Sequence, residues 1–133
     1  MIVKDLDDIE SHWQMKAIGH KNSKRNKSGL HLKTRKLLSK IYGTLDILEE
    51  VRVSVRKQQN LLFDFFIPLL NMAIEVHGEQ HFKYNSYFHK TRWNFAKQRD
   101  NDNAKRQWCE KNNITLVELL YDETLDDWKE KLE

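Results

Sequence analysis

The chain has 133 residues and a formal net charge of +3 at pH 7, and this length fits a single domain, residues 1–133, with a self-sufficient core. The lone cysteine excludes an intramolecular disulfide and a cysteine-based zinc centre, and it fits a reducing compartment. No apolar run reaches the ~18 residues of a membrane span and no signal-peptide pattern follows Met1, so we expect no membrane partner.

The first 29 residues combine an expected helix with a basic loop. Asp5–Ala17 places apolar residues at helical spacing, and acidic residues crowd its first turn, where the helix dipole favours them. Gly19–Gly29 is polar and bounded by glycine, which predicts a loop. Its Lys and Arg side chains either contact nucleic-acid phosphates or form an ordinary solvated surface: Lys21, Lys24, Arg25 and Lys27.

A second helix is predicted over Leu30–Tyr42, where leucines recur at near-helical spacing and Gly43 follows as a plausible C-cap. Arg35 and Lys36 lie on this helix. They are candidate contacts with the backbone of DNA, and the alternative is that they belong to a solvated helix face.

A strand is predicted over Ile47–Arg56, because valines alternate there with polar residues. We expect this strand to pair with the next apolar run, Leu61–Ile67, across the short polar segment between them. Glu49 or Glu50, near its start, either approaches a site on that sheet or faces solvent.

The most apolar stretch of the chain is Leu61–Phe82, and it nevertheless carries several charged side chains. It divides into Leu61–Ile67 and Met72–His77 around Pro68–Asn71, which has turn chemistry, so a β-hairpin is predicted. Side chains alternate along a strand. The first strand therefore presents one face of Phe63, Phe65 and Ile67 and another of Leu62, Asp64 and Phe66. The second presents Ile74 and Val76 on one face and Ala73, Glu75 and His77 on the other.

A turn centred between Leu69 and Leu70 places Asp64 directly opposite Glu75. Such residues have Cβ atoms roughly 4.5–5.5 Å apart, and like charges there are destabilising. The two carboxylates therefore require a proton or a cation, and Mg²⁺ is a hard ion that prefers oxygen ligands. His77 points into the same site. A turn shifted by one residue breaks this pairing.

Beyond the hairpin, Gly78 permits a bend, and Gln80 and His81 follow at the mouth of the site. The aromatic residues of the next segment either stack on nucleic-acid bases or form a small packing cluster: Tyr84, Tyr87 and Phe88.

The last third of the chain predicts a helix, a strand and a helix. Thr91–Lys111 has an apolar stripe of Trp93, Ala96, Ala104 and Trp108. Ile114–Leu120 is an apolar strand, and a capping-box-like Thr124 precedes a short acidic helix, Leu125–Leu132. The whole order predicts an α/β (α+β) fold: a central mixed sheet of about four strands with at least one crossover, flanked by helices, with the hairpin carrying the site.

Asp64, a short hairpin, then Glu75-x-His77 resembles the metal site of the PD-(D/E)XK nuclease superfamily, with His77 where a lysine is usual. The string FDFFIPLLNMAIEVHGEQHF is more closely similar to two branches. These are the very-short-patch-repair endonuclease type and small endonuclease-like domains with an I-E-V-x-G-x-Q-H strand end. The resemblance covers Phe63–Phe82 and, more weakly, Gln98–Tyr121, so residues 1–29 lie outside it. Many such nucleases carry a Glu on the first helix, whereas this chain has no Asp or Glu between Ser11 and Leu45.

The resemblance implies a restriction-endonuclease-like fold and a metal-dependent DNA endonuclease. Asp64, Glu75 and the Val76 carbonyl would hold Mg²⁺, for which Mn²⁺ substitutes, and His77 would activate water. Gln80 and His81 would lie near the catalytic centre. Lys105, on a helical motif with Gln98 and Asp102, would supply positive charge.

The expected partner is DNA, whether duplex, branched or mismatched, and a homodimer is the arrangement that suits a double-strand cut. A cytoplasmic protein of bacterial or phage origin is the expected setting. Two alternatives stay open: a non-catalytic nucleic-acid-binding or assembly module on a decayed nuclease fold, and an unrelated core with a buried acid pair.

Overall fold

The computed structural model describes residues 1–17, 28–85, 89 and 91–133. Its main sheet has four strands in the order β3–β4–β5–β6: β3 (Leu48–Arg56), β4 (Gln59–Ile67), β5 (Met72–His77) and β6 (Thr115–Leu120). The described residues also form three α-helices: α1 (Gly29–Ile41), α3 (Arg92–Lys111) and α4 (Leu125–Lys131). The predicted mixed α/β class with a four-stranded sheet is therefore confirmed.

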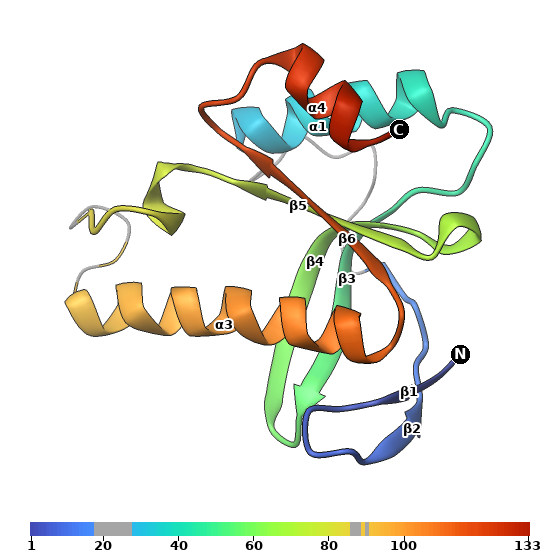
Figure 1. The fold of residues 1–133 in the computed structure, drawn as a ribbon, viewed down its shortest axis with the longest axis vertical. Coiled ribbons are helices and arrows are strands. Elements are labelled where there is room, and N and C mark those ends of the chain that lie inside the picture. Colours follow the sequence, from blue (N-terminus) through green and yellow to red (C-terminus); the bar gives the residue numbers. More distant parts are fainter. Residues whose placement is uncertain (18–27, 86–88, 90) are drawn as a thin grey trace.

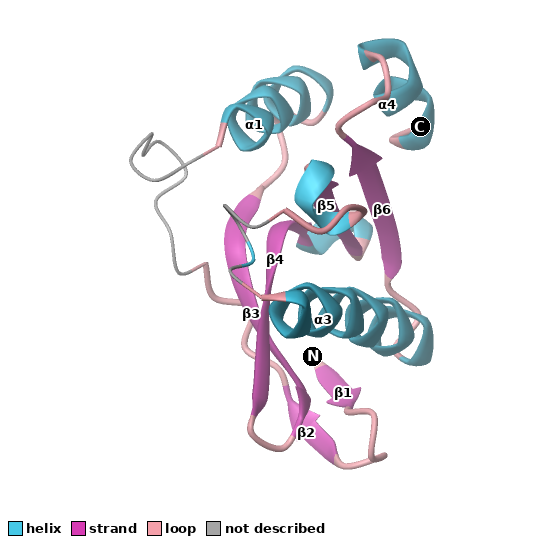
Figure 2. Ribbon diagram, turned by 90° about the vertical axis from the view of Figure 1, so that its left-hand side faces the viewer, coloured by secondary structure: helices cyan, strands magenta, loops and turns pink. Residues whose placement is uncertain are grey.

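The sheet is mixed because β3, β4 and β5 run antiparallel in succession, whereas β6 runs parallel to β5. A parallel neighbour requires a crossover connection. The chain makes that crossover through α3, which lies on one side of β5 and β6, while α1 and α4 lie side by side on the other (Figures 1 and 2). The predicted crossover is confirmed.

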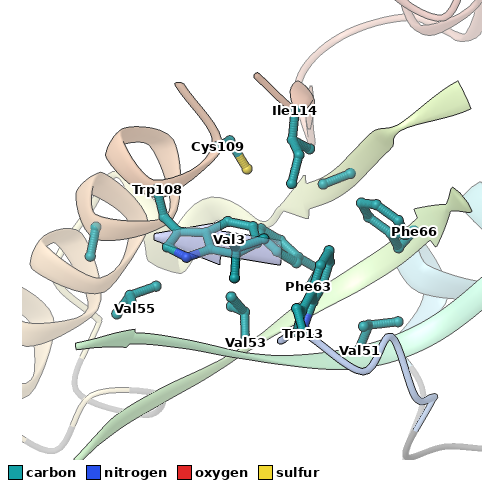
Figure 3. Packing of buried hydrophobic residues seen from close by; sticks show 12 residues of the cluster. Val3, Trp13, Val51, Val53, Val55, Phe63, Phe66, Trp108, Cys109 and Ile114 are labelled. Atoms are coloured by element: carbon teal, nitrogen blue, oxygen red, sulfur yellow. The ribbon is translucent and has the colours of Figure 1, made fainter. Parts of the chain in front are cut away.

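Each side of the sheet has its own apolar core. The core on the α3 side centres on Trp108, which packs edge-on against Trp13 with ring centroids 5.0 Å apart (Figure 3). The core on the opposite side joins α1 and α4 to the strands through Leu38, Ile74 and Trp128. The strands of the main sheet therefore separate two buried cores.

The hairpin of β4 and β5 has the predicted register. Phe65 pairs with Ile74 and Ile67 with Met72, around the 3₁₀ turn η1 (Pro68–Leu70). Asn71 closes the turn with a φ of 50°, in the left-handed region that asparagine tolerates. This register sets Asp64 opposite Glu75, as the sequence predicts.

The predicted alternation of β4 is wrong at Phe63. Phe63 belongs to the core on the α3 side, whereas Phe65 belongs to the core on the α1 side, although a regular strand would place them together. The neighbouring strand explains the change, because Glu50 has a φ of 54° between the paired residues Glu49 and Val51. On either side of this position the halves of the two strands contribute to different cores.

The helix predicted over residues 5–17 is also wrong. The segment forms a small hairpin of β1 (Ile2–Lys4) and β2 (Glu10–His12). The Asp5 carboxylate accepts hydrogen bonds from the backbone N–H groups of Asp7 and Ile9, which fixes a turn in place of a first helical turn. Trp13 is buried against the sheet and donates its indole N–H to the Arg52 carbonyl at 2.9 Å.

The remaining helices and strands lie within two residues of their predicted bounds. α3 begins after Thr91, whose hydroxyl accepts from the N–H of Asn94, and α4 begins with the capping box of Thr124 and Asp127. The predicted stripe of α3 holds only in its second half, where Ala104 and Trp108 are buried, since Trp93 is exposed. A search of the described helices finds none with the length and apolar character to cross a membrane.

Candidate active site

The site lies where β4 and β5 stop pairing. Their ladder ends at Phe65 and Ile74, and the next two residues substitute side chains for backbone partners. The carboxylate of Glu75 accepts from the N–H of Asp64 at 3.0 Å, and the carboxylate of Asp64 accepts from the N–H of Val76 at 2.9 Å. Each carboxylate therefore binds the backbone of the opposite strand at the point where β4 and β5 separate.

Glu75 is buried and Asp64 is half-buried, and the two acids share one cation. Lys105 of α3 contacts the Oε1 atom of Glu75, and their side chains are 14% and 5% exposed. Burial, the charge of Glu75 and a hydrogen bond between the two side chains raise the pKa of Asp64 well above its ordinary value. Burial opposes the charge of Lys105, but the carboxylates of Glu75 and Asp64 outweigh it and raise the lysine pKa. The site thus retains Lys105 as a cation and favours a proton on Asp64.

The carbonyl of Val76 faces the same opening. The carbonyls of Asn71 and His77, at odd-numbered positions, face β6 and the residue after it, since they accept hydrogen bonds from the N–H groups of Thr115 and Tyr121. Since the N–H and C=O of one strand residue point to the same side, the N–H bond from Val76 to Asp64 places the Val76 carbonyl toward β4. The Val76 carbonyl therefore lies on the same edge of β5 as its N–H group, which binds Asp64.

His77 is the middle of a hydrogen-bonded chain. Its Nε2 atom lies 2.9 Å from Glu118 Oε1 and its Nδ1 atom 3.0 Å from His81 Nδ1. Arg106 binds the same Glu118 carboxylate at 2.7–3.0 Å. The hydrogen bond from His77, together with Arg106, lowers the pKa of Glu118 to about 2. His77 is therefore anchored to a permanent anion.

The chain continues from His81 into α3. The Nδ1 atom of His81 also lies 2.8 Å from Asp102 Oδ2, and the Nε2 atom of His81 lies 3.3 Å from the Gln98 amide nitrogen. The Gln98 oxygen in turn is 2.7 Å from Nε2 of His89. The helical motif of Gln98, Asp102 and Lys105 singled out in the sequence thus faces the site, with Asp102 and Gln98 on His81 and Lys105 on Glu75.

The structure brings together five of the predicted catalytic or metal-binding residues, Asp64, Glu75, His77, His81 and Lys105, with Val76 between them. Gln80 belongs to the short 3₁₀ turn η2 (Glu79–His81), and its side chain is outside the described part of the structure. The aromatic residues Tyr87 and Phe88 also lie outside the described residues.

The predicted nucleic-acid contacts are mostly outside the described residues, namely Lys21, Lys24, Arg25 and Lys27. Lys36 is exposed on α1. Arg35 instead reaches into the protein, where its guanidinium binds the buried Glu49 at 2.8 and 2.9 Å, and His31 binds the same carboxylate at 2.7 Å. The Glu49 carboxylate is therefore bound by two residues of α1.

Glu118 is the residue of the candidate site that sequence reasoning missed. It is the direct neighbour of Glu75 in the parallel pairing of β5 and β6. The signal was present, because Glu118 interrupts the apolar strand ITLVELL as Glu75 interrupts its own. Its partner could not be read from the sequence, since His77 and Glu118 lie 41 residues apart.

The chain is similar to viral proteins. It is 40% identical over 62 residues to "Uncharacterized protein 307L" of Invertebrate iridescent virus 6, covering 47% of this chain and 32% of that protein. It is 34% identical over 68 residues to "Uncharacterized protein 033L" of Invertebrate iridescent virus 3, covering 51% and 35%. "Uncharacterized protein 094L" of Frog virus 3 is 42% identical over 62 residues, covering 46% and 40%. The matches thus span well under half of each relative, and no family model or solved structure matches.

Proposed function

We propose that this protein is a metal-dependent DNA endonuclease with a restriction-endonuclease-like fold. The observation that carries the proposal is the mutual locking of Asp64 and Glu75 at the opening of β4 and β5, with Lys105 against them. Buried Glu75 and half-buried Asp64, together with one lysine, leave a negative charge that a proton or a cation must balance.

The groups present fit a hard divalent ion. Asp64, Glu75 and the Val76 carbonyl offer oxygen atoms, which are the donors that Mg²⁺ and Mn²⁺ prefer. Burial and the charge of Glu75 raise the pKa of Asp64, so a carboxylate at this position is favoured only with a compensating positive charge. When bound, such an ion would polarise a phosphate and lower the pKa of an attacking water.

The side chains around this position divide the remaining work. Lys105 keeps its charge beside Glu75 and would stabilise the charge that develops on the phosphate. The His77 side chain is only 3% exposed, with its ring nitrogens on Glu118 and His81, so we assign it the positioning of its neighbours. His81 has a side chain 17% exposed and is the imidazole that can exchange a proton with substrate or water.

Plasmid cleavage in Mg²⁺ or Mn²⁺ tests the proposal. We expect Asp64→Asn and Glu75→Gln to abolish cleavage, because each removes a carboxylate ligand with little change of shape. Glu110→Gln is the matched control, since Glu110 is exposed on α3. Cleavage that persists in both Asp64→Asn and Glu75→Gln would refute the mechanism, provided that circular dichroism shows all variants folded.

A non-catalytic DNA-binding module is the second candidate. It is favoured by the contact of Lys105 with Glu75, because a lysine and a proton on Asp64 together balance the two acids without a metal. Duplex binding at low salt by a wild-type protein that never cleaves would support this candidate. Absence of both binding and cleavage would exclude the two functions together.

A further inference from the structure

Three atoms that can bind a metal lie close together beside the candidate active site. The cluster that they form includes neither Asp64 nor Glu75. His77 Nδ1, His81 Nδ1 and an Asp102 carboxylate oxygen all lie within 4.8 Å of one another. His81 Nδ1 is 3.0 Å from the histidine nitrogen and 2.8 Å from the carboxylate oxygen. They come from β5, η2 and α3, so the fold itself gathers them.

The protonation of the two rings follows from their outer partners. Glu118 is a carboxylate, so His77 donates to it from Nε2 and, when neutral, presents a lone pair at Nδ1. Asn85 donates its N–H to Nδ1 of His89, so neutral His89 carries its proton on Nε2 and donates to the Gln98 oxygen. The Gln98 amide nitrogen then faces Nε2 of His81, which leaves the His81 proton on Nδ1. One proton therefore stands among three acceptor atoms.

We propose that His77, His81 and Asp102 bind a divalent transition-metal ion, Zn²⁺, which replaces that proton. Two imidazole nitrogens and one carboxylate are a borderline donor set that favours Zn²⁺ over Mg²⁺. Bonds of about 2.0–2.2 Å set tetrahedral ligands roughly 3.3–3.5 Å apart. The two contacts of His81 Nδ1, at 3.0 and 2.8 Å, need to lengthen by only about half an ångström to reach that geometry, and the remaining pair lies within 4.8 Å.

The surroundings match those of a metal site. The Glu118 carboxylate on Nε2 of His77 fixes the ring and raises the basicity of Nδ1, as outer carboxylates do for metal-bound histidines. Three protein ligands leave a fourth position open. A cavity of about 120 Å³ borders His81 and Asp102 and is otherwise lined by Phe82, Arg99, Asn103 and Arg106. This cavity gives water or an anionic ligand access to the open position.

The contact between the Gln98 amide nitrogen and His81 disfavours zinc binding, and it therefore provides a specific test of the proposal. Metal on Nδ1 of His81 moves the ring proton to Nε2, where it meets the Gln98 amide nitrogen at 3.3 Å. A carboxylate in that place accepts from both His81 and His89. Gln98→Glu is therefore expected to tighten Zn²⁺ binding, a gain that a purely structural histidine cluster would not produce.

The experiment titrates Zn²⁺ into the untagged, metal-free 133-residue chain against a chromogenic chelator. Co²⁺, followed by its visible absorption, reports the coordination geometry. We expect a single tight equivalent and a four- or five-coordinate Co²⁺ spectrum. Asp102→Asn and His81→Gln should remove this binding, whereas Glu118→Gln should weaken it by about 10–100-fold. Circular dichroism checks the fold of each variant.

Three control variants separate this site from its surroundings. His12→Gln alters an exposed histidine on β2 and should leave binding unchanged. Asp64→Asn and Glu75→Gln should also leave it unchanged, because the inference does not depend on the proposed nuclease activity. Zn²⁺ binding retained in Asp102→Asn and His81→Gln, or lost equally in Glu75→Gln, would overturn the proposal. So would the absence of a tight equivalent in the wild-type protein.

Discussion

Replacing Lys105 by methionine removes a buried charge and leaves two acids facing each other. The side chains of Lys105 and Glu75 are 14% and 5% exposed, so water compensates little for the loss. Breaking a buried ion pair by removing one partner typically costs about 3–5 kcal/mol. We expect the free energy of unfolding of Lys105→Met to fall by about that amount in chelator-treated buffer.

Lys111→Met is the matched control on the same helix. Lys111 forms an ion pair with Asp8, but these side chains are 28% and 74% exposed. Surface pairs of this kind contribute about 0–1 kcal/mol. The difference between the two lysine variants thus isolates the effect of burial at the candidate active site.

Urea denaturation followed by tryptophan fluorescence measures both variants, since Trp13 and Trp108 are buried against each other. The double variant Lys105→Met with Glu75→Gln should be more stable than Lys105→Met alone, because it no longer holds an unpaired buried carboxylate. A coupling energy of about 0.5–3 kcal/mol is expected for contacting residues. The reasoning is refuted if Lys105→Met is no less stable than Lys111→Met.

Three further predictions concern other parts of the molecule. The hydrogen bond from His77, with help from Arg106, holds the pKa of Glu118 at about 2, below its ordinary 4.5. This contribution to the free energy of unfolding is therefore complete above pH 4.5 and is lost as the pH falls toward 2. In denaturation measured at a series of pH values, Glu118→Gln should reduce the loss of stability between pH 4.5 and 2. An unchanged loss in this variant would contradict the prediction. Burial raises the pKa of Cys109 to about 12, so a thiol reagent should label the protein only after denaturation. Thr124→Ala removes the capping box of α4 and should lower the free energy of unfolding by about 1 kcal/mol, with no measurable change as the contrary result.

The hairpin could be predicted because its local chemistry and its burial agree. A proline-led turn sets the register, and acids inside apolar strands mark the site, so Asp64 and Glu75 were placed opposite each other from the sequence. The sequence predicts α1 and α4 with the help of capping residues, Gly43 and Thr124, and it predicts α3 from an apolar stripe that holds in its second half.

The parts that could not be predicted depend on contacts distant in sequence. Leu6, Ile9 and Trp13 fit a helix by spacing, but the Asp5 turn and the burial of Trp13 against Trp108 favour a hairpin. The facing of Phe63 depends on a left-handed residue in the adjacent strand. The hydrogen bonds of His77 depend on β6, whose register beside β5 has no local signal.

The central claim is that Asp64 and Glu75 share one divalent ion. A crystal soaked in Mn²⁺ and measured for anomalous scattering tests this directly. We predict an anomalous peak between the two carboxyl groups and the Val76 carbonyl, with its loss in Glu75→Gln. At saturating Mn²⁺, no peak there and Lys105 still seated on Glu75 would contradict the account.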